Sequence, residues 1–438
     1  MSHAGESRLA GLTILRYAHA SGSGGGVEQY LSNLNRALGE RNRFATIQME
    51  ISEREEQLAE TVETLGGCRL TRVPLFVNPA SWAESVSGKP ETFPDKVKSR
   101  FVRNVLCASP VYELFTKRCL LRRTVRRQPG EPDNAGQKTR ELIKRFHVDL
   151  IVIHSPGGAD ASEIMAEAER ANIPVALVHH FANERLASLA MCRQTAKAAG
   201  VAGVCGCDVP GYLLSNFSNL SDGVDTDFFR TEKAEPLPKN FPAPILFLPA
   251  RITPSKGQAD LLRVASLLKQ RGIRVTVAQA GRVDSPAFEN ELRAMARREG
   301  LDGQVEFVGQ LDARRLRDWY GAARVLVFPT RHHEGLPRIL MECQAMGLPP
   351  VVYDIGGTPE GLLDGQTGFL IPSGDVRRMA DAVETLLKDD AKRSAMSEAG
   401  RRFVEKKFSL RALAGRHEDF YLKILEGRRR GAKTDRQT

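Results

Sequence analysis

The stretch "HHEGLPRILMECQAMGLPPVV", residues 332–352, combines a loop, a helix and the start of a strand, and carries two acids eight positions apart. Pro337 suits the first turn of a helix, because its missing N–H would be unpaired there anyway. Glu334 precedes that helix, and Glu342 lies inside it, about 12 Å further along the axis. One acid can therefore meet one end of an extended ligand and the other its far end. The structural alternative for Glu342 is a salt bridge to Arg338, four residues earlier on the same helix face.

Short apolar runs alternate with helical patterns on both sides of this stretch, which predicts an α/β protein with parallel sheets covered by helices. In the second half we expect strands at 244–250, 274–281, 305–309, 324–329 and 349–357, with helices at 257–271, 286–299, 312–321, 337–346 and 376–388. In the first half we expect strands at 12–18, 149–154, 174–180 and 202–206, with helices at 27–39, 160–171 and 183–199. Two such units, joined near 222–242, predict two doubly wound domains facing each other. Ligands of such sheets bind beyond the carboxyl ends of the strands.

The length and composition agree with this organisation. A chain of 438 residues is too long for one compact core, and 42% apolar with 26% charged residues is typical of a soluble globular protein. We find no signal peptide and no run of 18 apolar residues, so we expect a cytoplasmic protein. The seven cysteines are scattered without a CxxC pair, which favours reduced thiols over a metal site.

The positive charge is concentrated in one segment. Residues 96–145 contain 14 Lys and Arg but only four acids, an excess equal to the net charge of +10 for the whole chain. Two interpretations stay open: a solvated insertion, or a surface for anionic lipid at the inner face of the membrane or for an acidic acceptor. No nucleic-acid-binding motif accompanies the charge, so we expect no nucleic acid partner.

Three further motifs follow predicted strands. In "SGSGGGVEQYLSNLNRAL" the glycines precede a helix that begins near Val27, a pattern that admits an anion at the helix N-terminus, although a flexible turn without a ligand is the alternative. In "ARITPSKGQADLL", Arg251 and Lys256 flank a short turn and offer donors suited to neighbouring phosphates, although surface Arg and Lys are common. In "VHHFANERL", His179 and His180 close a strand; a core or capping histidine is the alternative to a role at the site.

Together these motifs resemble the retaining glycosyltransferases of family four, which have the GT-B fold. The family's Glu, seven residues, Glu signature is matched by Glu334 and Glu342. "ARITPSKG" is similar to its Gly-Arg-Leu…Lys-Gly turn, "LSDGVDTDFF" to its "NGVD" link with Asp222 in place of Asn, "GGGVEQYLSNLNRAL" to its "GGAE" start, and "YDIGGTPEGLLDGQTGFLIPSGD" to its closing pattern. The resemblance is strong over 222–375 and moderate over the first 40 residues. The family usually places Gly where Pro337 stands, and Pro offers no N–H.

The resemblance implies a nucleotide-diphosphate sugar as co-substrate, no cofactor and no metal. The donor site that it implies comprises Gly25, Gly26, Arg251, Lys256, Gly281, Glu334, Gly335, Leu336 and Glu342. The catalytic group that it implies comprises His180, Glu334, Arg251 and Lys256. Arg251 and Lys256 would hold the diphosphate, and Glu342 would accept from the ribose hydroxyls. Glu334, with the Gly335 and Leu336 amides, would face the donor sugar.

The resemblance also implies the domain plan. We expect an acceptor-side domain over 1–221 with the basic insertion at about 96–145, a nucleotide-sugar-binding domain over 222–390, helices at 391–427 that pack back on the N-terminal domain, and a basic tail at 428–438. The expected reaction is transfer of the sugar to a hydroxyl of a glycan, a lipid-linked or a small-molecule acceptor. The alternatives are a sugar-nucleotide 2-epimerase of the same architecture and a non-catalytic membrane-associated scaffold.

Overall fold

The protein divides into two compact units in a computed structural model. Unit 1 comprises Met1–Leu220 with Ala414–Thr438, and unit 2 comprises Ser221–Leu413. The structure describes residues 9–18, 26–41, 45–52, 60–65, 68–76, 135–154, 159–180, 194–195, 197–206, 217–241 and 244–434. Most of the predicted helix at 183–199 and most of the predicted basic insertion lie outside these ranges.

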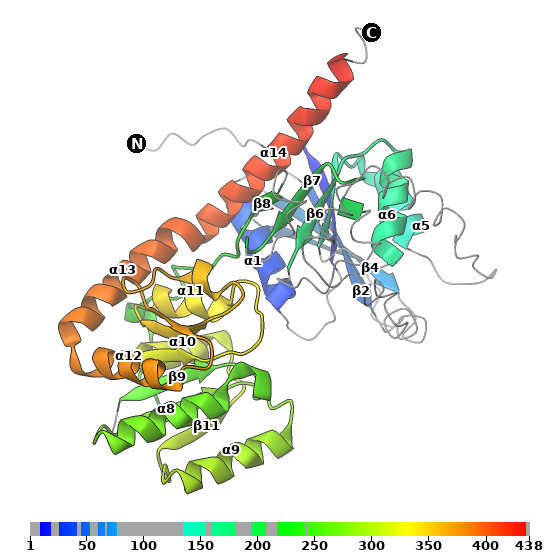
Figure 1. The fold of residues 1–438 in the computed structure, drawn as a ribbon. Helices are drawn as coiled ribbons and strands as arrows, with labels where there is room; N and C mark the ends of the chain where they lie inside the picture. Colours follow the sequence, from blue (N-terminus) through cyan, green and yellow to red (C-terminus); the bar gives the residue numbers. More distant parts are fainter. Residues whose placement is uncertain are drawn as a thin grey trace, which may run out of the picture. The chain divides into compact units, whose positions relative to one another are not determined.

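Unit 1 is built on an eight-stranded sheet with the order β3-β4-β2-β1-β5-β6-β7-β8, in which all pairs are parallel except β3 with β4. Its strands are β1 Thr13–Ala18, β2 Ala45–Ser52, β3 Thr61–Leu65, β4 Cys68–Phe76, β5 Leu150–His154, β6 Val175–His179, β7 Gly200–Gly203 and β8 Phe217–Asn219. Its helices are α1 Gly26–Arg41, α5 Ala135–Phe146, α6 Ala159–Arg170 and most of α14 Leu410–Thr434 (Figure 1).

The core of unit 1 follows from the apolar runs of its central strands. Every residue of β5 is buried, as expected for a strand covered on both faces. The main apolar cluster joins Leu15 and Tyr17 of β1 with Ile151 and Ile153 of β5, and Leu142 and Ile164 of the covering helices pack against them. The expected strands at 12–18, 149–154 and 174–180 are confirmed by β1, β5 and β6.

Unit 2 contains a six-stranded, all-parallel sheet with the order β11-β10-β9-β12-β13-β14. Its strands are β9 Ile245–Pro249, β10 Thr276–Ala280, β11 Val305–Gly309, β12 Val325–Phe328, β13 Pro350–Asp354 and β14 Phe369–Pro372. Its helices are α8 Gln258–Gln270, α9 Pro286–Arg298, α10 Ala313–Ala322, α11 Arg338–Ala345, α12 Val376–Lys388 and α13 Asp390–Phe408, with short 3-10 helices η4 Thr231–Lys233, η5 Pro254–Lys256 and η6 Thr358–Gly361. The α/β class with two parallel-sheet domains is confirmed.

Side-chain caps fix where several of these helices begin. The Ser285 hydroxyl accepts from the Phe288 amide at 3.2 Å, with Pro286 in the first turn of α9. Asp375 caps α12 and Asp389 caps α13 in the same way, each accepting an amide hydrogen bond from three residues further on. The predicted boundaries of α12 at 376–388 are reproduced.

Both strand orders contain one point where the direction of winding reverses. In unit 2 the chain moves outward from β9 to β10 and β11, then returns to place β12 on the other side of β9. In unit 1 the corresponding reversal separates β1 from β5. Ligands of doubly wound sheets bind outside the carboxyl ends of the strands at such a point.

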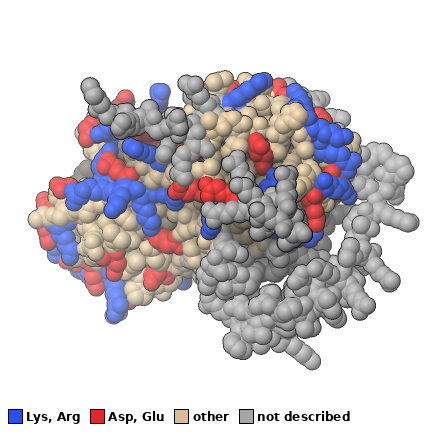
Figure 2. Space-filling model, turned by 90° about the horizontal axis from the view of Figure 1, so that it is seen from above, with Lys and Arg blue, Asp and Glu red and all other residues tan. Residues whose placement is uncertain are grey.

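Two expectations about segments of the chain are corrected. Residues 135–145 of the predicted basic insertion form α5, whose residues Thr139 and Leu142 are buried and which packs on α6. The charge of this helix is paired locally, since Arg140 donates to Glu167 at 2.8 and 2.7 Å. On the face seen in Figure 2, Lys and Arg side chains are interspersed with Asp and Glu over the described residues.

The second correction concerns the C-terminal helices. We expected residues 391–427 to pack on the N-terminal domain, but α13 belongs to unit 2, where it packs against α11 and α12. Met396, Val404 and Phe408 of α13 are buried there. The part of α14 from Ala414 onward belongs to unit 1. Among the described helices, none combines the length and apolar content needed to cross a bilayer.

Candidate functional site

The loop after β9 is held against the loop after β12 by a glycine. Gly257 has φ +80°, and a Cβ there would lie 1.8 Å from the carbonyl oxygen of Pro329. A side chain would therefore force the two loops apart. The Arg331 amide donates to the Ser255 carbonyl at 2.8 Å, which joins the same two loops a second time. The turn is possible because Gly257, the residue that follows η5, tolerates a left-handed backbone.

This contact brings Lys256 and Glu334 together. The Lys256 ammonium forms an ion pair with the Glu334 carboxylate, and the Thr330 hydroxyl lies 3.4 Å from the same carboxylate. Their side chains are 12% and 19% exposed, so the pair is shielded but remains open to solvent. Two of the predicted site residues thus meet at the carboxyl ends of β9 and β12, where the winding reverses.

Arg251 takes a different position from that of Lys256. Its guanidinium pairs with Asp284, in the loop after β10, at 2.8 Å, and its side chain is 56% exposed. The neighbouring Gly281 has φ +152°, and a Cβ there would meet the Ala250 carbonyl oxygen at 2.3 Å. The predicted site residues Arg251 and Gly281 therefore lie where the loops after β9 and β10 touch. The Asp284 partner was not anticipated from the sequence.

The backbone at Gly335 is supported by the loop after β13. A Cβ at Gly357 would meet the Gly335 carbonyl oxygen at 2.2 Å, and the Gly357 amide donates to the Glu334 carbonyl at 3.0 Å. Leu336 is buried, and α11 begins at Arg338. The glycine pair in "YDIGGTP" thus lets the β13 loop approach the backbone beside Glu334.

Glu342 is buried on α11 and is engaged on both oxygens. Tyr320 donates to Oε2 at 3.0 Å, and Arg338 donates to Oε1 at 3.2 Å. Arg338 also donates to Asp222 at 2.8 Å, so it lies between two buried carboxylates. Burial and the neighbouring Glu342 hold the pKa of Tyr320 well above its usual range. The salt-bridge alternative for Glu342 is therefore present in the structure.

The residues Asp222, Arg338 and Tyr320 were not predicted as part of the site. A possible signal existed at position 222, where an acid replaces the Asn of the family's link. The partner of Asp222 is Arg338, 116 positions away, and nothing in a single sequence connects the two residues.

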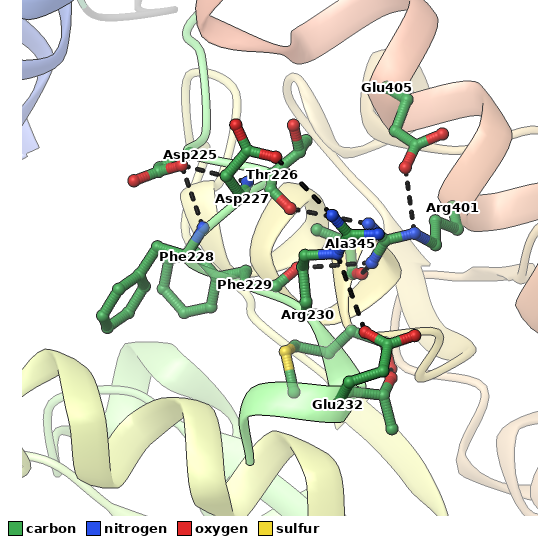
Figure 3. Close-up of polar contacts among 12 residues, drawn as sticks. Asp225, Thr226, Asp227, Phe228, Phe229, Arg230, Glu232, Ala345, Arg401 and Glu405 are labelled. Atoms are coloured by element: carbon green, nitrogen blue, oxygen red, sulfur yellow. Dashed lines mark hydrogen bonds and ion pairs between the residues drawn. The ribbon is translucent and has the colours of Figure 1, made fainter.

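Arg401 of α13 helps to anchor the segment that follows Asp222 (Figure 3). Arg401 donates to the carbonyl oxygens of Phe229 at 3.4 Å and Thr226 at 3.5 Å, and to that of Ala345, the last residue of α11. Glu405 pairs with the same guanidinium at 2.9 Å. These hydrogen bonds from Arg401 fix the carboxyl end of α11, the helix that carries Glu342.

Asp225 and Asp227 of this segment have an Asp-x-Asp spacing. The expectation of a site without metal did not take this pair into account. Asp225 accepts from the amides of Asp227 at 3.0 Å and Phe228 at 2.9 Å, which makes it a turn cap. The part of the chain that the structure describes contains no group of three or more His, Cys, Asp or Glu arranged to hold a metal ion.

In unit 1 the described site residues lie at the ends of β1, β5 and β6. Gly25 lies outside the described residues, and Gly26 is the first residue of α1. His179 ends β6 and His180 follows it. Both imidazoles are partly buried; burial lowers the pKa of His179 to about 4, and burial together with His179 lowers that of His180 to about 3. Both are therefore neutral at physiological pH.

His180 belongs to a buried polar cluster that sequence reasoning missed. Its Nε2 lies 2.9 Å from Nδ1 of His154, the fully buried last residue of β5. The ring of Tyr30, on α1, stands edge-on to His180 with centroids 4.8 Å apart. The Tyr30 hydroxyl lies 2.5 Å from Nε2 of His417 on α14, whose Nδ1 lies 2.9 Å from the Tyr421 hydroxyl. A histidine at the end of each of two adjacent strands was the available signal for the first pair.

The arrangement offers two kinds of chemistry, one in each unit. Unit 2 presents Lys256, Arg251 and backbone amides beside carboxylates, a set that suits an anionic ligand with hydroxyl groups. Unit 1 presents neutral imidazoles, which exchange hydrogen bonds at physiological pH without carrying charge.

Comparison with known proteins gives one family match. Residues 229–403 match the model of the family described as glycosyl transferases group 1. A GDP-mannose-dependent alpha-(1-6)-phosphatidylinositol monomannoside mannosyltransferase from Mycobacterium tuberculosis (strain ATCC 25618 / H37Rv) is 31% identical over 214 residues, which cover 46% of this chain and 54% of that protein. A D-inositol 3-phosphate glycosyltransferase from Xylanimonas cellulosilytica is 30% identical over 228 residues, which cover 50% and 54%. The chain thus spans about half the length of these curated relatives.

Solved structures match over nearly the whole chain. A glycosyltransferase from Rickettsia africae superposes with a TM-score of 0.65 at 17% identity, covering 94% of this chain and 98% of that one. HepE of Anabaena, solved in complex with UDP, gives a TM-score of 0.65 at 15% identity, covering 93% and 99%. At these identities the likeness shows the fold, and the GT-B fold expected from the sequence is confirmed.

Proposed function

Residues 229–403 match the model of the family described as glycosyl transferases group 1, and from this match we propose that the chain is a glycosyltransferase that moves a sugar from a nucleotide-diphosphate sugar to a hydroxyl acceptor. The acceptor belongs to glycan, polysaccharide or glycolipid synthesis. The anomeric configuration of the sugar is retained.

The observation that carries this proposal is the meeting of Lys256 with Glu334 at the winding reversal of unit 2. A nucleotide-diphosphate sugar needs a cation for its diphosphate within a few ångströms of an acceptor for the sugar hydroxyls. Lys256 supplies the first and Glu334 the second, from loops that Gly257 holds in contact. Arg251, exposed at the neighbouring loop, adds a planar fork of donors for the same diphosphate.

The remaining donor contacts extend along α11. The Gly335 and Leu336 amides precede the helix, where the positive end of its dipole favours an anionic or hydroxyl oxygen. Pro337 has no N–H, so these two amides are the backbone donors of this turn. Glu342, in the second turn, accepts from the ribose hydroxyls.

The chemistry proceeds by departure of the diphosphate. The bond between the anomeric carbon and the diphosphate oxygen breaks, and negative charge builds on the leaving group beside Lys256 and Arg251. Preorganised cations in a site shielded from water stabilise such charge by several kcal/mol, roughly. The acceptor hydroxyl attacks from the face that the diphosphate leaves, and its proton passes to the departing oxygen. Retention follows, and His180 contacts the sugar.

The test begins with donor binding. A panel comprising GDP-mannose, UDP-glucose and UDP-N-acetylglucosamine is screened for thermal stabilisation, since saturating ligand raises stability by roughly a few kcal/mol. A stabilising donor is then incubated with candidate acceptors, including inositol phosphates and phosphatidylinositol glycosides, because the relatives are named for such substrates. We expect free nucleoside diphosphate and a glycosylated product with the donor's anomeric configuration.

Two outcomes contradict the proposal. Conversion of the donor to its 2-epimer without any acceptor product indicates an epimerase. Absence of stabilisation by every sugar nucleotide indicates a scaffold. Lys256→Met, which keeps an unbranched apolar stem but removes the ammonium group, should abolish the donor-induced stabilisation, whereas the exposed control Lys406→Met should retain it.

A further inference from the structure

The hydrogen bond between His154 and His180 contains one proton, and its direction decides what His180 offers to a ligand. Nδ1 of His154 lies 2.9 Å from Nε2 of His180. The other ring nitrogen of His154, Nε2, is buried and has no hydrogen-bond partner among the described residues. His154 is 0% exposed, whereas His180 is partly exposed.

Both imidazoles of this pair are neutral. Burial lowers the pKa of His154 well below its usual range, and His180, Arg16 and His417 lower it further. Arg16, fully buried in β1, acts in the same direction on His417. Each ring of the pair therefore carries a single N–H, and two arrangements are available.

The two arrangements differ in the group that they bury. If His180 donated from Nε2, His154 would carry its own proton on Nε2 and bury an N–H without an acceptor. If His154 donates from Nδ1, its Nε2 is left as a bare lone pair. Orphaned buried backbone N–H groups are rarer in proteins than carbonyl oxygens with an unused lone pair, and a buried polar group left unpaired costs about 1–3 kcal/mol; we extend this preference to the imidazole. The second arrangement is therefore favoured.

We propose that His154 is a positioning residue that donates its Nδ1–H to Nε2 of His180 and so fixes His180 in the tautomer that carries its proton on Nδ1. His180 then presents an N–H donor, and not a lone pair, to its ligand. This inference rests on the proposed function only for the identity of the ligand, a donor-sugar or diphosphate oxygen.

The surroundings hold the pair in this orientation. The Tyr30 ring packs edge-on against both imidazoles, with centroids 4.8 Å from His180 and 5.9 Å from His154. Its hydroxyl is engaged by Nε2 of His417, 2.5 Å away. Among the described residues, the groups that face the pair are Tyr30, His417 and the Arg16 cation, together with the neighbouring His179, and no carboxylate of these residues is a hydrogen-bond partner of either ring.

The assignment has a consequence for the reaction. With Nδ1 protonated and Nε2 accepting from His154, His180 has no free lone pair with which to remove the proton of an acceptor hydroxyl. It can donate to an oxygen on the sugar or the leaving group. This agrees with a reaction in which the departing diphosphate oxygen, and not the protein, receives that proton.

The experiment reads the tautomer directly. Long-range ¹H–¹⁵N spectra of protein labelled with ¹⁵N-histidine distinguish protonated from unprotonated ring nitrogens, and His180→Asn and His154→Asn assign the two signals. We expect Nδ1 of His180 to be protonated and Nε2 to be unprotonated at pH 7.5. A His180 signal with a protonated Nε2 overturns the proposal, whatever the activity.

Two substitutions of similar shape test the consequence for catalysis. His154→Asn places an amide N–H near the position of Nδ1 and should preserve both the tautomer and kcat. His154→Asp places an acceptor there, should move the His180 proton to Nε2, and should lower kcat by about 10- to 100-fold, with a smaller effect on KM. His147→Asn, at an exposed position after α5, is the control.

The outcomes separate this inference from the proposed function. If His154→Asn and His154→Asp lose activity equally while the His180 tautomer is unchanged in both, His154 has a structural role and the proposal is wrong. If the expected tautomer is found but no sugar nucleotide supports transfer, the proposed function fails and the tautomer assignment stands.

Discussion

Replacing Arg338 by Met should destabilise unit 2 more than removal of any exposed arginine. Arg338 lies 2.8 Å from Asp222 and 3.2 Å from Glu342, and the side chains of these two acids are 7% and 8% exposed. Met keeps an unbranched apolar stem but removes the guanidinium, so two carboxylates stay buried without a cation. Breaking a buried ion pair in this way costs about 3–5 kcal/mol.

The effect is measurable as a shift in the unfolding temperature. For a unit of this size each kcal/mol corresponds to a shift of about 2–4 °C, so Arg338→Met should lower Tm by about 6–20 °C. Trp319 is buried in unit 2 and the sequence contains one other tryptophan, Trp82, so Trp319 fluorescence in a Trp82→Phe background reports the unfolding of unit 2.

A matched control and a partial rescue complete the design. Arg402→Met removes an exposed pair with Glu398, whose side chains are 69% and 68% exposed, and should cost no more than about 1 kcal/mol. Adding Asp222→Asn to Arg338→Met removes one uncompensated charge and should recover part of the loss. If Arg338→Met costs no more than Arg402→Met, the reasoning from burial is refuted.

Four further predictions test other parts of the structure. Gly257→Ala should cost at least about 1–3 kcal/mol and abolish donor-induced stabilisation, because its Cβ would separate the two loops of the site; unchanged donor stabilisation would contradict this. Arg251→Ala should slow sugar transfer by about 10-fold or more, and transfer at the full rate would refute its role at the diphosphate. Since burial keeps the pKa of His417 well below its usual range, the unfolded state binds a proton at His417 that the folded state does not as pH falls below about 6.5, so this histidine alone should lower the stability of unit 1 by about 1.4 kcal/mol per pH unit; His417→Asn should reduce the pH dependence of the unfolding free energy, measured by urea titration, by that amount. The basic segment 96–145 predicts that liposomes of anionic lipid retain the protein at low salt and release it at high salt. Retention that does not depend on the salt concentration would count against an electrostatic membrane contact.

The first half of unit 1 shows where sequence reasoning failed. The strands expected from the sequence include none between residues 44 and 145, yet β2, β3 and β4 lie there. In β2 the buried positions include Thr46 and Gln48, and Gln48 accepts from Asn35 of α1 at 3.0 Å, so no apolar run marks the strand. Most residues of β3 are exposed, because this strand is at the edge of the sheet. Burial of polar groups depends on partners that are distant in sequence.

The site shows a similar division. The sequence predicts that Lys256 and Glu334 each follow a strand, since each motif stands after an apolar run, and the structure adds that the two strands, β9 and β12, are neighbours. The partners that engage the predicted residues were found only in the structure: Asp284 with Arg251, His154 with His180, and Tyr320 with Glu342. Each of these pairs joins residues from different elements of the fold.

The sequence by itself determined the α/β class, the apolar strands at the centre of each sheet, and the helices that begin at capped residues, because these depend on periodicity and on residues within a few positions of one another. The tertiary structure alone decided which charged and polar groups are buried together. That outcome depends on hydrogen-bond and charge compensation between different elements of the fold, from 22 positions apart for Tyr320 with Glu342 to 116 for Asp222 with Arg338, and such compensation leaves no local pattern to read.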